Sequence, residues 1–172
     1  MLVRIRQLLV SFPVILLLLT TTVGFGFSDA DLQKIKATNS CPGCDLAGAY
    51  LTGSNFANAD LRGANLSSAS VSSANLTGAD LSKANLSNAN MTRTKLKGAK
   101  MIGVRLSGAI MTDAGLEDTD LTDANMMGTV LWDANLARAN LSGASLSGAQ
   151  LGGANWVDGS KCKEDSVSTC SR

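Results

Sequence analysis

The stretch ADLRGANLSSASVSSANLTGADLSKANL, residues 59–86, has a period of five residues that extends over most of the chain. From Leu46 to Trp156 a large apolar residue occupies every fifth position, twenty-three positions in all. An α-helix turns about 100° per residue, so a step of five gives no continuous apolar stripe. In a flat strand the same step would put successive leucines on opposite faces. The period therefore predicts a chain that turns a corner once per repeat, which is a solenoid.

The other positions of the repeat agree with a solenoid. Leucine fills sixteen of the twenty-three apolar positions. The residue two before the apolar position is alanine in seventeen of the twenty-three repeats. Side chains two residues apart on an extended segment lie on the same face, so we expect the alanine and the apolar residue of each repeat both to point into the core. The residue two after the apolar position is Gly, Asn or Asp in eighteen cases, and these residue types tolerate turn geometry.

Three short runs carry a family resemblance: Ala64-Asn65-Leu66, Ala79-Asp80-Leu81 and Ala139-Asn140-Leu141-Ser142-Gly143. They resemble the A-(N/D)-L-x-x unit of the pentapeptide-repeat family, and the resemblance covers about two thirds of the chain. It implies an all-β fold, a right-handed quadrilateral β-helix with four pentapeptides per coil and about six coils. At roughly 4.8 Å per stacked strand the rod would be about 28 Å long.

A coil of twenty residues stacks residues that are twenty apart, and the charges allow a test within the chain. Between residues 60 and 138, five opposite-charge pairs have this spacing, against two like-charge pairs, Asp60 with Asp80 and Asp113 with Asp133. The opposite pairs are Arg93 with Asp113, Lys97 with Glu117, Asp118 with Arg138, and Lys100 with both Asp80 and Asp120. Each exposed pair contributes about 0–1 kcal/mol, so we expect these ladders to set register more than stability.

The chain divides into four parts. Residues 1–28 carry Arg4 and Arg6 before an apolar run, which predicts a secretory signal peptide; an uncleaved membrane anchor is the alternative. Residues 29–45 predict a short capping helix and a CPGC turn, residues 46–158 the repeat, and residues 159–172 a polar tail. A signal peptide places the protein in the periplasm, the thylakoid lumen or outside the cell.

The four cysteines form two pairs, Cys41 with Cys44 and Cys162 with Cys170, one at each end of the solenoid. In an exported chain an even count predicts disulfides. About 28 Å of rod separates the pairs, so we expect no zinc site shared between them, because the ligands of tetrahedral zinc lie about 2.3 Å from the ion. Cys41-Pro42-Gly43-Cys44 is also similar to the C-x-x-C of thiol–disulfide exchangers, so a redox role is the alternative.

The sequence offers little for catalysis. It has no histidine, which excludes the commonest general base and every histidine-ligated metal site. We therefore predict a protein that is not an enzyme and binds no cofactor or metal. The acidic residues between 113 and 123 predict a solvated, charge-paired surface. The basic residues between 93 and 105 would circle the rod as a belt. With 15 basic against 14 acidic residues, we expect no nucleic-acid partner.

One surface feature indicates a partner. Ile110 and Val130 occupy positions that are usually polar and lie twenty apart, so they should stack on one outer face. Trp132 projects from the same face and Met127 lies just before its corner. An apolar patch of this kind marks contact with a partner. The alternative is that the tail, through Val157 and Val167, folds back over the patch.

The predicted function is an exported, non-catalytic scaffold that presents a rigid surface to an unidentified protein or envelope component. The predicted oligomeric state is a monomer, or an end-to-end or face-to-face dimer. The family resemblance implies one alternative, because some pentapeptide-repeat proteins mimic DNA and bind DNA gyrase. Thiol–disulfide exchange through Cys41 and Cys44 is the other.

Overall fold

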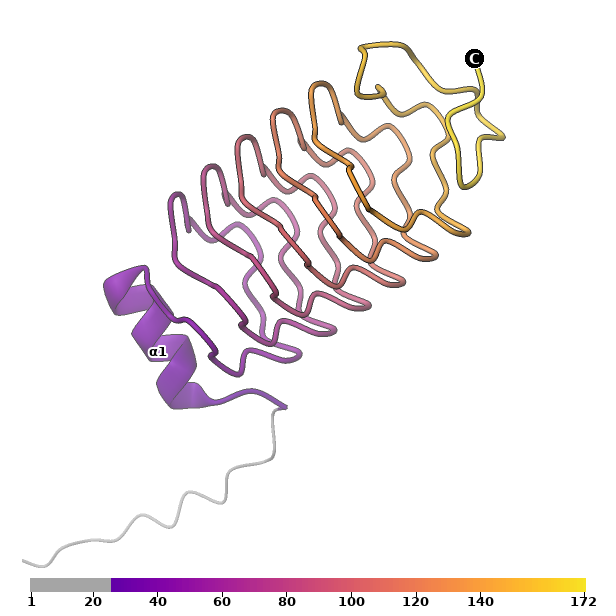
Figure 1. Ribbon diagram of the computed structural model, residues 1–172. Helices are drawn as coiled ribbons and strands as arrows, with labels where there is room; N and C mark the ends of the chain where they lie inside the picture. Colours follow the sequence, from indigo (N-terminus) through magenta and orange to yellow (C-terminus); the bar gives the residue numbers. More distant parts are fainter. Residues whose placement is uncertain (1–25) are drawn as a thin grey trace, which may run out of the picture.

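The computed structural model describes residues 26–172, and the predicted signal peptide or anchor falls almost wholly outside them. Within the described residues there is one helix, α1 (Asp29–Thr38), followed by a rod of stacked coils and an irregular C-terminal tail (Figure 1). No helix in this part of the chain has the length and apolar character needed to cross a bilayer.

Each coil contains twenty residues. Parallel β-bridges join residues that are twenty apart, in an unbroken series from Ser40 with Asp60 to Asn135 with Asn155. The period of twenty predicted from the charges is therefore confirmed. The bridges are isolated and do not extend into longer strands, because the two residues after each apolar position form a turn. A side of the coil is thus one bridged residue between two core residues.

The two core positions of the repeat are filled as predicted. Apolar and alanine positions from Leu46 to Leu136 are almost all buried, and they form one continuous core. Where threonine replaces alanine at 94, 119 and 129, the hydroxyl donates to a backbone carbonyl. Thr94 Oγ1, for example, lies 2.9 Å from the Val71 carbonyl oxygen, so burial leaves no polar atom unpaired there.

The corners explain the preference for Gly, Asn and Asp. The second residue after the apolar position has a left-handed backbone, as at Gly53 (φ +67°) and Asp113 (φ +58°). Glycine adopts this conformation without strain, and Asn and Asp tolerate it better than other residues. Stacked corners also interlock, because the Asp133 carboxylate fills the space that a side chain at Gly153 would need.

Helix α1 closes the N-terminal end of the rod. Ser28 caps its start by accepting a hydrogen bond from the Asp31 N–H, and Asn39 ends it in the left-handed conformation. Ile35, on the inner face of α1, is only 1% exposed and joins the core of the rod. The helix lies across the first coil as a lid (Figure 1).

The tail closes part of the C-terminal end. It runs antiparallel to the last coil, with bridges from Gln150 to Val167 and from Asn155 to Lys161. Trp156, in the last apolar position, is only partly buried, whereas Phe56 in the same inner column is 3% exposed. Leu141 and Leu146 are also partly exposed, so this end is less completely covered.

Candidate functional site

One side of the rod carries no charge along its outward column. We call it the Tyr50 side, and its column of bridged residues is Tyr50, Ser70, Asn90, Ile110, Val130 and Gln150. The outward columns of the other three sides each contain charged residues, among them Asp60, Lys95 and Arg105. The structure therefore stacks Ile110 directly on Val130, as the spacing of twenty predicted.

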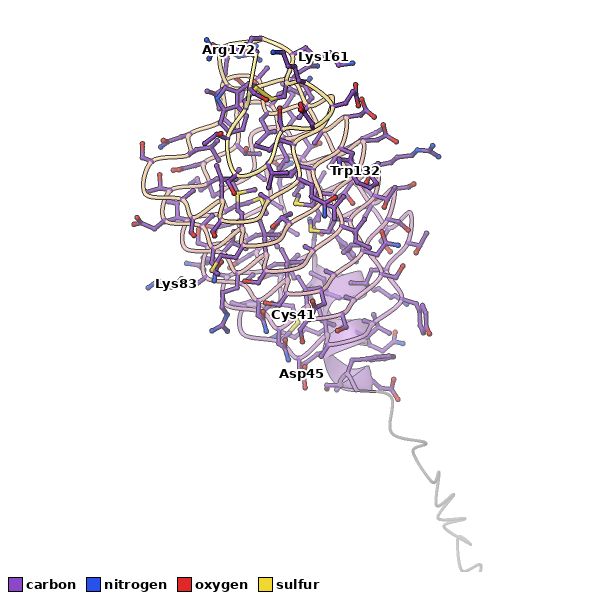
Figure 2. The ribbon with its side chains drawn as sticks, turned by 90° about the vertical axis from the view of Figure 1, so that its right-hand side faces the viewer. Cys41, Asp45, Lys83, Trp132, Lys161 and Arg172 are labelled. Carbon is purple, nitrogen blue, oxygen red and sulfur yellow. A yellow bond between two sulfur atoms is a disulfide. The ribbon has the colours of Figure 1, made fainter. Side chains whose placement is uncertain are left out.

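Two large apolar side chains lie at the corners of this side. Trp132 follows Val130 at one corner (Figure 2). Met127 precedes Val130 at the other corner, and each of the two side chains is 49% exposed. Ile110 is 44% exposed, and Val130 is partly buried between these neighbours. We call these four residues the apolar patch.

The tail does not lie over the apolar patch. Val167 bridges Gln150 and so extends the same side by one step beyond it, where it is 55% exposed. The backbone of Glu164 packs against Gly152, which is stacked on Trp132 one coil later. Val157 packs against the core instead. The alternative, in which the tail covers the patch through Val157 and Val167, does not match this arrangement.

The charge ladders form in part. Arg138 binds Asp118 through two hydrogen bonds of 2.6 and 2.8 Å, and Arg93 lies 3.5 Å from Asp113. The other three predicted pairs, which involve Lys97 and Lys100, are not among the ion pairs of the described residues. Long side chains at exposed corners can bind other partners. The Glu117 carboxylate, for example, accepts a hydrogen bond from the Asn135 side chain at 2.7 Å.

Local hydrogen bonds also hold the acidic side chains in their charged form. The Arg138 guanidinium lowers the pKa of Asp118, and the hydroxyl and N–H of Thr122 lower the pKa of Asp120. These carboxylates point to separate partners and do not converge on a shared point. The acidic run between 113 and 123 thus lies on a solvated surface, on which Asp113 and Asp118 pair with arginines.

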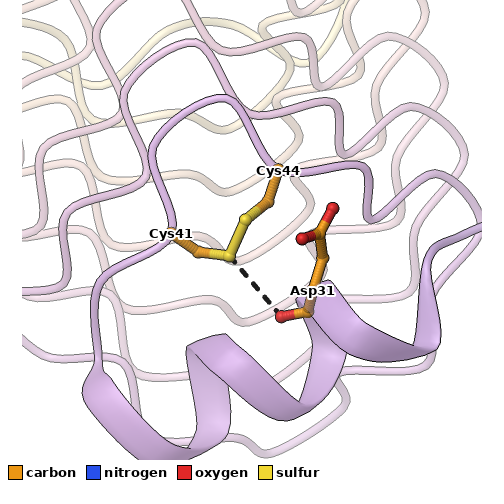
Figure 3. A group of neighbouring side chains, drawn as sticks. All are labelled: Asp31, Cys41 and Cys44. Carbon is orange, nitrogen blue, oxygen red and sulfur yellow. Dashed lines mark hydrogen bonds between the residues drawn. A yellow bond between two sulfur atoms is a disulfide. The ribbon is translucent and has the colours of Figure 1, made fainter.

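The N-terminal cap contains a second cluster, in which a disulfide joins Cys41 and Cys44 under the start of α1 (Figure 3). Cys41 and Cys44 are 0% and 4% exposed, and they occupy an apolar and an alanine position of the repeat. The Asp31 carboxylate lies within 4.8 Å of both sulfurs. Its Oδ2 accepts from the Asp45 N–H at 2.9 Å, and its backbone carbonyl oxygen lies 3.5 Å from Cys41 Sγ.

Sequence reasoning missed Asp31. It lies ten residues before Cys41, and its proximity depends on how α1 docks on the first coil. The available signal was its place four residues before Ile35, one turn along the face of the helix that reaches the core.

The second cysteine pair lies in the tail, at the other end of the rod. A disulfide joins Cys162 to Cys170, and the Cys162 N–H donates to the Ala154 carbonyl at 2.9 Å. No carboxylate of the described residues joins this pair in a group comparable to the one at Asp31.

An open pocket of about 460 Å³ lies between the end of α1 and the first coil. Its walls are residues 35–39 of the helix and its cap and residues 54–57 of the coil. Lys36 is the one charged side chain in its lining. The Asn39 side-chain amide donates a hydrogen bond to the Ala57 carbonyl oxygen at 2.8 Å. This lining provides no cluster of reactive groups.

Comparisons with known proteins give a consistent picture of the repeat. The model of the family "Pentapeptide repeats" matches eight copies in segments 44–82, 74–113, 89–128 and 119–155. No curated protein matches the chain in sequence.

Three solved structures resemble the rod. The pentapeptide repeat protein Rfr23 of the cyanobacterium Cyanothece 51142 has a TM-score of 0.59 at 28% identity, over 70% of this chain and 92% of that one. HetL of Nostoc sp. PCC 7120, involved in regulating heterocyst differentiation, has a TM-score of 0.51 at 34% identity, over 71% and 63%. A protein of the Arabidopsis thaliana thylakoid lumen has a TM-score of 0.53 at 33% identity, over 55% and 66%.

Proposed function

Because the chain belongs to the pentapeptide-repeat family, we propose that it is an exported, non-catalytic scaffold whose rigid rod presents the Tyr50 side to a protein or envelope partner. The rod is a right-handed quadrilateral β-helix in this proposal, with α1 as its N-terminal cap. One observation carries the proposal: the apolar patch lies on the one side whose outward column is uncharged.

The flat geometry of this side favours a scaffold. Its outward residues are fixed by a bridge at every coil, so Ile110 and Val130 lose little freedom when a partner packs on them. Trp132 adds a large, amphipathic ring at the corner, and aromatic residues of this kind often anchor interfaces. The other three sides carry charged residues in their outward columns and would have to be desolvated at greater cost.

Export is supported by the cysteines. Both pairs form disulfides, and disulfides persist in oxidising compartments such as the periplasm. The relative from the Arabidopsis thylakoid lumen agrees with such a compartment. We propose that residues 1–28 act as the signal peptide, or as an anchor if they are retained.

No observation specifically favours either alternative function, the DNA mimic or thiol–disulfide exchange. A DNA mimic needs an acidic rod, whereas Lys95, Lys100 and Arg105 place positive charges on three of the four outward columns. Thiol–disulfide exchange needs an accessible sulfur, whereas Cys41 and Cys44 are buried under α1.

A photo-crosslinking amino acid at position 132 tests the proposal in the full-length protein, expressed in cells that export it. We expect a discrete adduct with one partner, because the ring at this corner is half exposed. The matched control is position 102, where Ile102 is 39% exposed at a corner outside the Tyr50 side and should give no such adduct. Equal adducts from both positions, or none from 132, would overturn the proposal.

A further inference from the structure

We propose that Asp31, Cys41 and Cys44 form a binding site for one thiophilic divalent cation of the zinc class, which becomes available when the Cys41–Cys44 disulfide is reduced. The two sulfurs and a carboxylate oxygen already lie within 4.8 Å of one another. The site is independent of the partner surface, because it lies at the end of the rod under α1 (Figure 3).

The donor set suits zinc. Two cysteines separated by two residues have the spacing found in structural zinc sites, and a carboxylate oxygen is an accepted third ligand. Zinc would hold the two sulfurs at about 2.3 Å from the ion, which requires them to be roughly 3.8 Å apart. The Cα atoms are 5.4 Å apart, and rotation about the side-chain bonds can separate the sulfurs without moving the backbone far. Water would complete the tetrahedron.

The surroundings of the sulfurs favour a cation. Cys41 Sγ lies 3.5 Å from the Asp31 carbonyl oxygen, and the Asp31 carboxylate faces both sulfurs. Asp31 takes part in none of the ion pairs of the described residues, so no basic side chain neutralises it. Two thiolates would add two negative charges at the same point, and a divalent ion would offset two of the three charges.

The carboxylate is also held in position. The Asp45 N–H donates to Oδ2 at 2.9 Å, which leaves Oδ1 available to an ion. Hydrogen bonds of this kind orient metal ligands and contribute to affinity. The main-chain bond from the Ser28 N–H to the Asp45 carbonyl, at 3.0 Å, fixes the same segment from the other side.

The redox step is a thiol–disulfide exchange with a small dithiol, which reaches the buried sulfurs when α1 opens from the first coil. One thiolate of the dithiol attacks a sulfur of the pair and breaks the S–S bond, forming a mixed disulfide. The second thiol of the dithiol then displaces the protein sulfur and closes a cyclic disulfide. Two electrons and two protons reach Cys41 and Cys44, and binding of the ion releases the two protons again. Disulfide and metal are thus alternative crosslinks beneath α1.

Metal titration of the full chain tests this proposal. The chain is reduced with a phosphine, which does not compete for the ion, and Co²⁺ is added while thiolate-to-metal and d–d absorption are recorded. We expect one equivalent per chain, displaced by Zn²⁺, and none in the oxidised protein. Circular dichroism of the reduced, metal-free chain reports whether the rod stays folded. Absence of binding to a folded, reduced chain would overturn the proposal.

Matched variants assign the ligands. The double variant Cys162→Ser/Cys170→Ser should still bind one equivalent, whereas Cys41→Ser/Cys44→Ser should bind none. Asp31→Asn keeps both thiols and should weaken binding by more than about tenfold, while Asp29→Asn on the same helix should not change it. If Asp31→Asn binds as tightly as the unmodified chain, or if binding follows Cys162 and Cys170, the proposed site is wrong.

Discussion

At the N-terminal end of the rod helix α1 covers the core with side chains, whereas at the C-terminal end the tail covers the last coil with backbone. Ile35 of α1 is fully buried, and the helix reaches the edge of the first coil at Asp45. The tail instead pairs edge to edge, with the Leu151 N–H donating to the Ser166 carbonyl at 2.9 Å. It spans two sides of the last coil and leaves the other two open.

The difference shows that an exposed coil presents two separate problems. A coil end exposes apolar side chains and also unpaired N–H and C=O groups. The helix solves mainly the first problem and the tail mainly the second. The tail leaves two sides of the last coil open. Near these open sides Leu141 and Leu146 are partly exposed, and their N–H groups have no partner among the hydrogen bonds of residues 26–172. The C-terminal end is the weaker closure of the two in this comparison.

The largest effect should come from removing the buried side chain of α1. Ile35→Ala should lower the free energy of unfolding by about 2–5 kcal/mol, because it leaves a cavity between the helix and the first coil. Urea denaturation followed by circular dichroism measures the change. Val167→Ala, the corresponding truncation in the tail, should change it by less than about 0.5 kcal/mol, since that side chain is 55% exposed. Equal losses would show that the two caps do not differ in this way.

Loss of the tail disulfide should rank second. Cys162→Ser/Cys170→Ser opens a loop with a separation of eight residues, and the chain-entropy model gives a loss of about 2–3 kcal/mol. The tail should then detach locally, because the segment that pairs with two sides of the last coil is no longer closed into a loop by the disulfide. Trypsin cleavage at Lys161 and Lys163 measures this release. A cleavage rate equal to that of the oxidised chain would mean that backbone pairing alone holds the tail.

A smaller effect should follow from a side chain between the tail and the last coil. A Cβ at Gly152 would lie 2.5 Å from the Glu164 carbonyl oxygen, so Gly152→Ala must displace the tail backbone. We expect a loss of about 1–3 kcal/mol in thermal or urea unfolding. Gly115→Ala is the control, because its nearest neighbour is the mobile Glu117 carboxylate at 3.0 Å. A loss no larger than that of the control would show that the tail adapts freely.

The smallest effect should be that of pH. Hydrogen bonds from Ser160, followed by the charge of Arg172, lower the pKa of Asp158, and Arg138 lowers that of Asp118. A lowered folded-state pKa contributes stability above the unfolded value, about 3.9, and this contribution is lost as pH falls through the folded value. The chain has no histidine, so stability should stay nearly constant from about pH 5 to 8.

Below about pH 4 the tail should loosen first, because Asp158 pairs with Arg172 at 2.6 Å across the tail. Hydrogen exchange of the tail amides, compared with those of α1, measures this order. Earlier opening of α1 on acidification would contradict it.

The core of the rod could be predicted from the sequence because its signal is repeated. Each leucine specifies the same environment, so a period of five and a coil of twenty emerge from many positions at once. Stacked pairs such as Ile110 with Val130 followed directly. Cys41 and Cys44 also occupy an apolar and an alanine position of the repeat, and both are buried.

Features that depend on a single contact could not be predicted in this way. Whether Glu117 binds Lys97 or Asn135 is decided by rotamers of exposed side chains that differ little in energy. The place of Asp31 beside Cys41 depends on the docking angle of α1. The path of the tail across the Tyr50 side likewise has no periodic signal, because residues 159–172 lie outside the repeat.

The bridges between residues twenty apart also limit how the gene can change in length. Deleting one pentapeptide would keep every leucine inside, yet it would turn all later coils by one side. A deletion between residues 118 and 130, for example, would separate Ile110 from Val130 and Asp118 from Arg138, because each pair would then be fifteen residues apart. Deleting or duplicating a whole coil of twenty residues keeps the remaining coils in register. Insertions and deletions among descendants of this gene should therefore be tolerated in units of twenty codons.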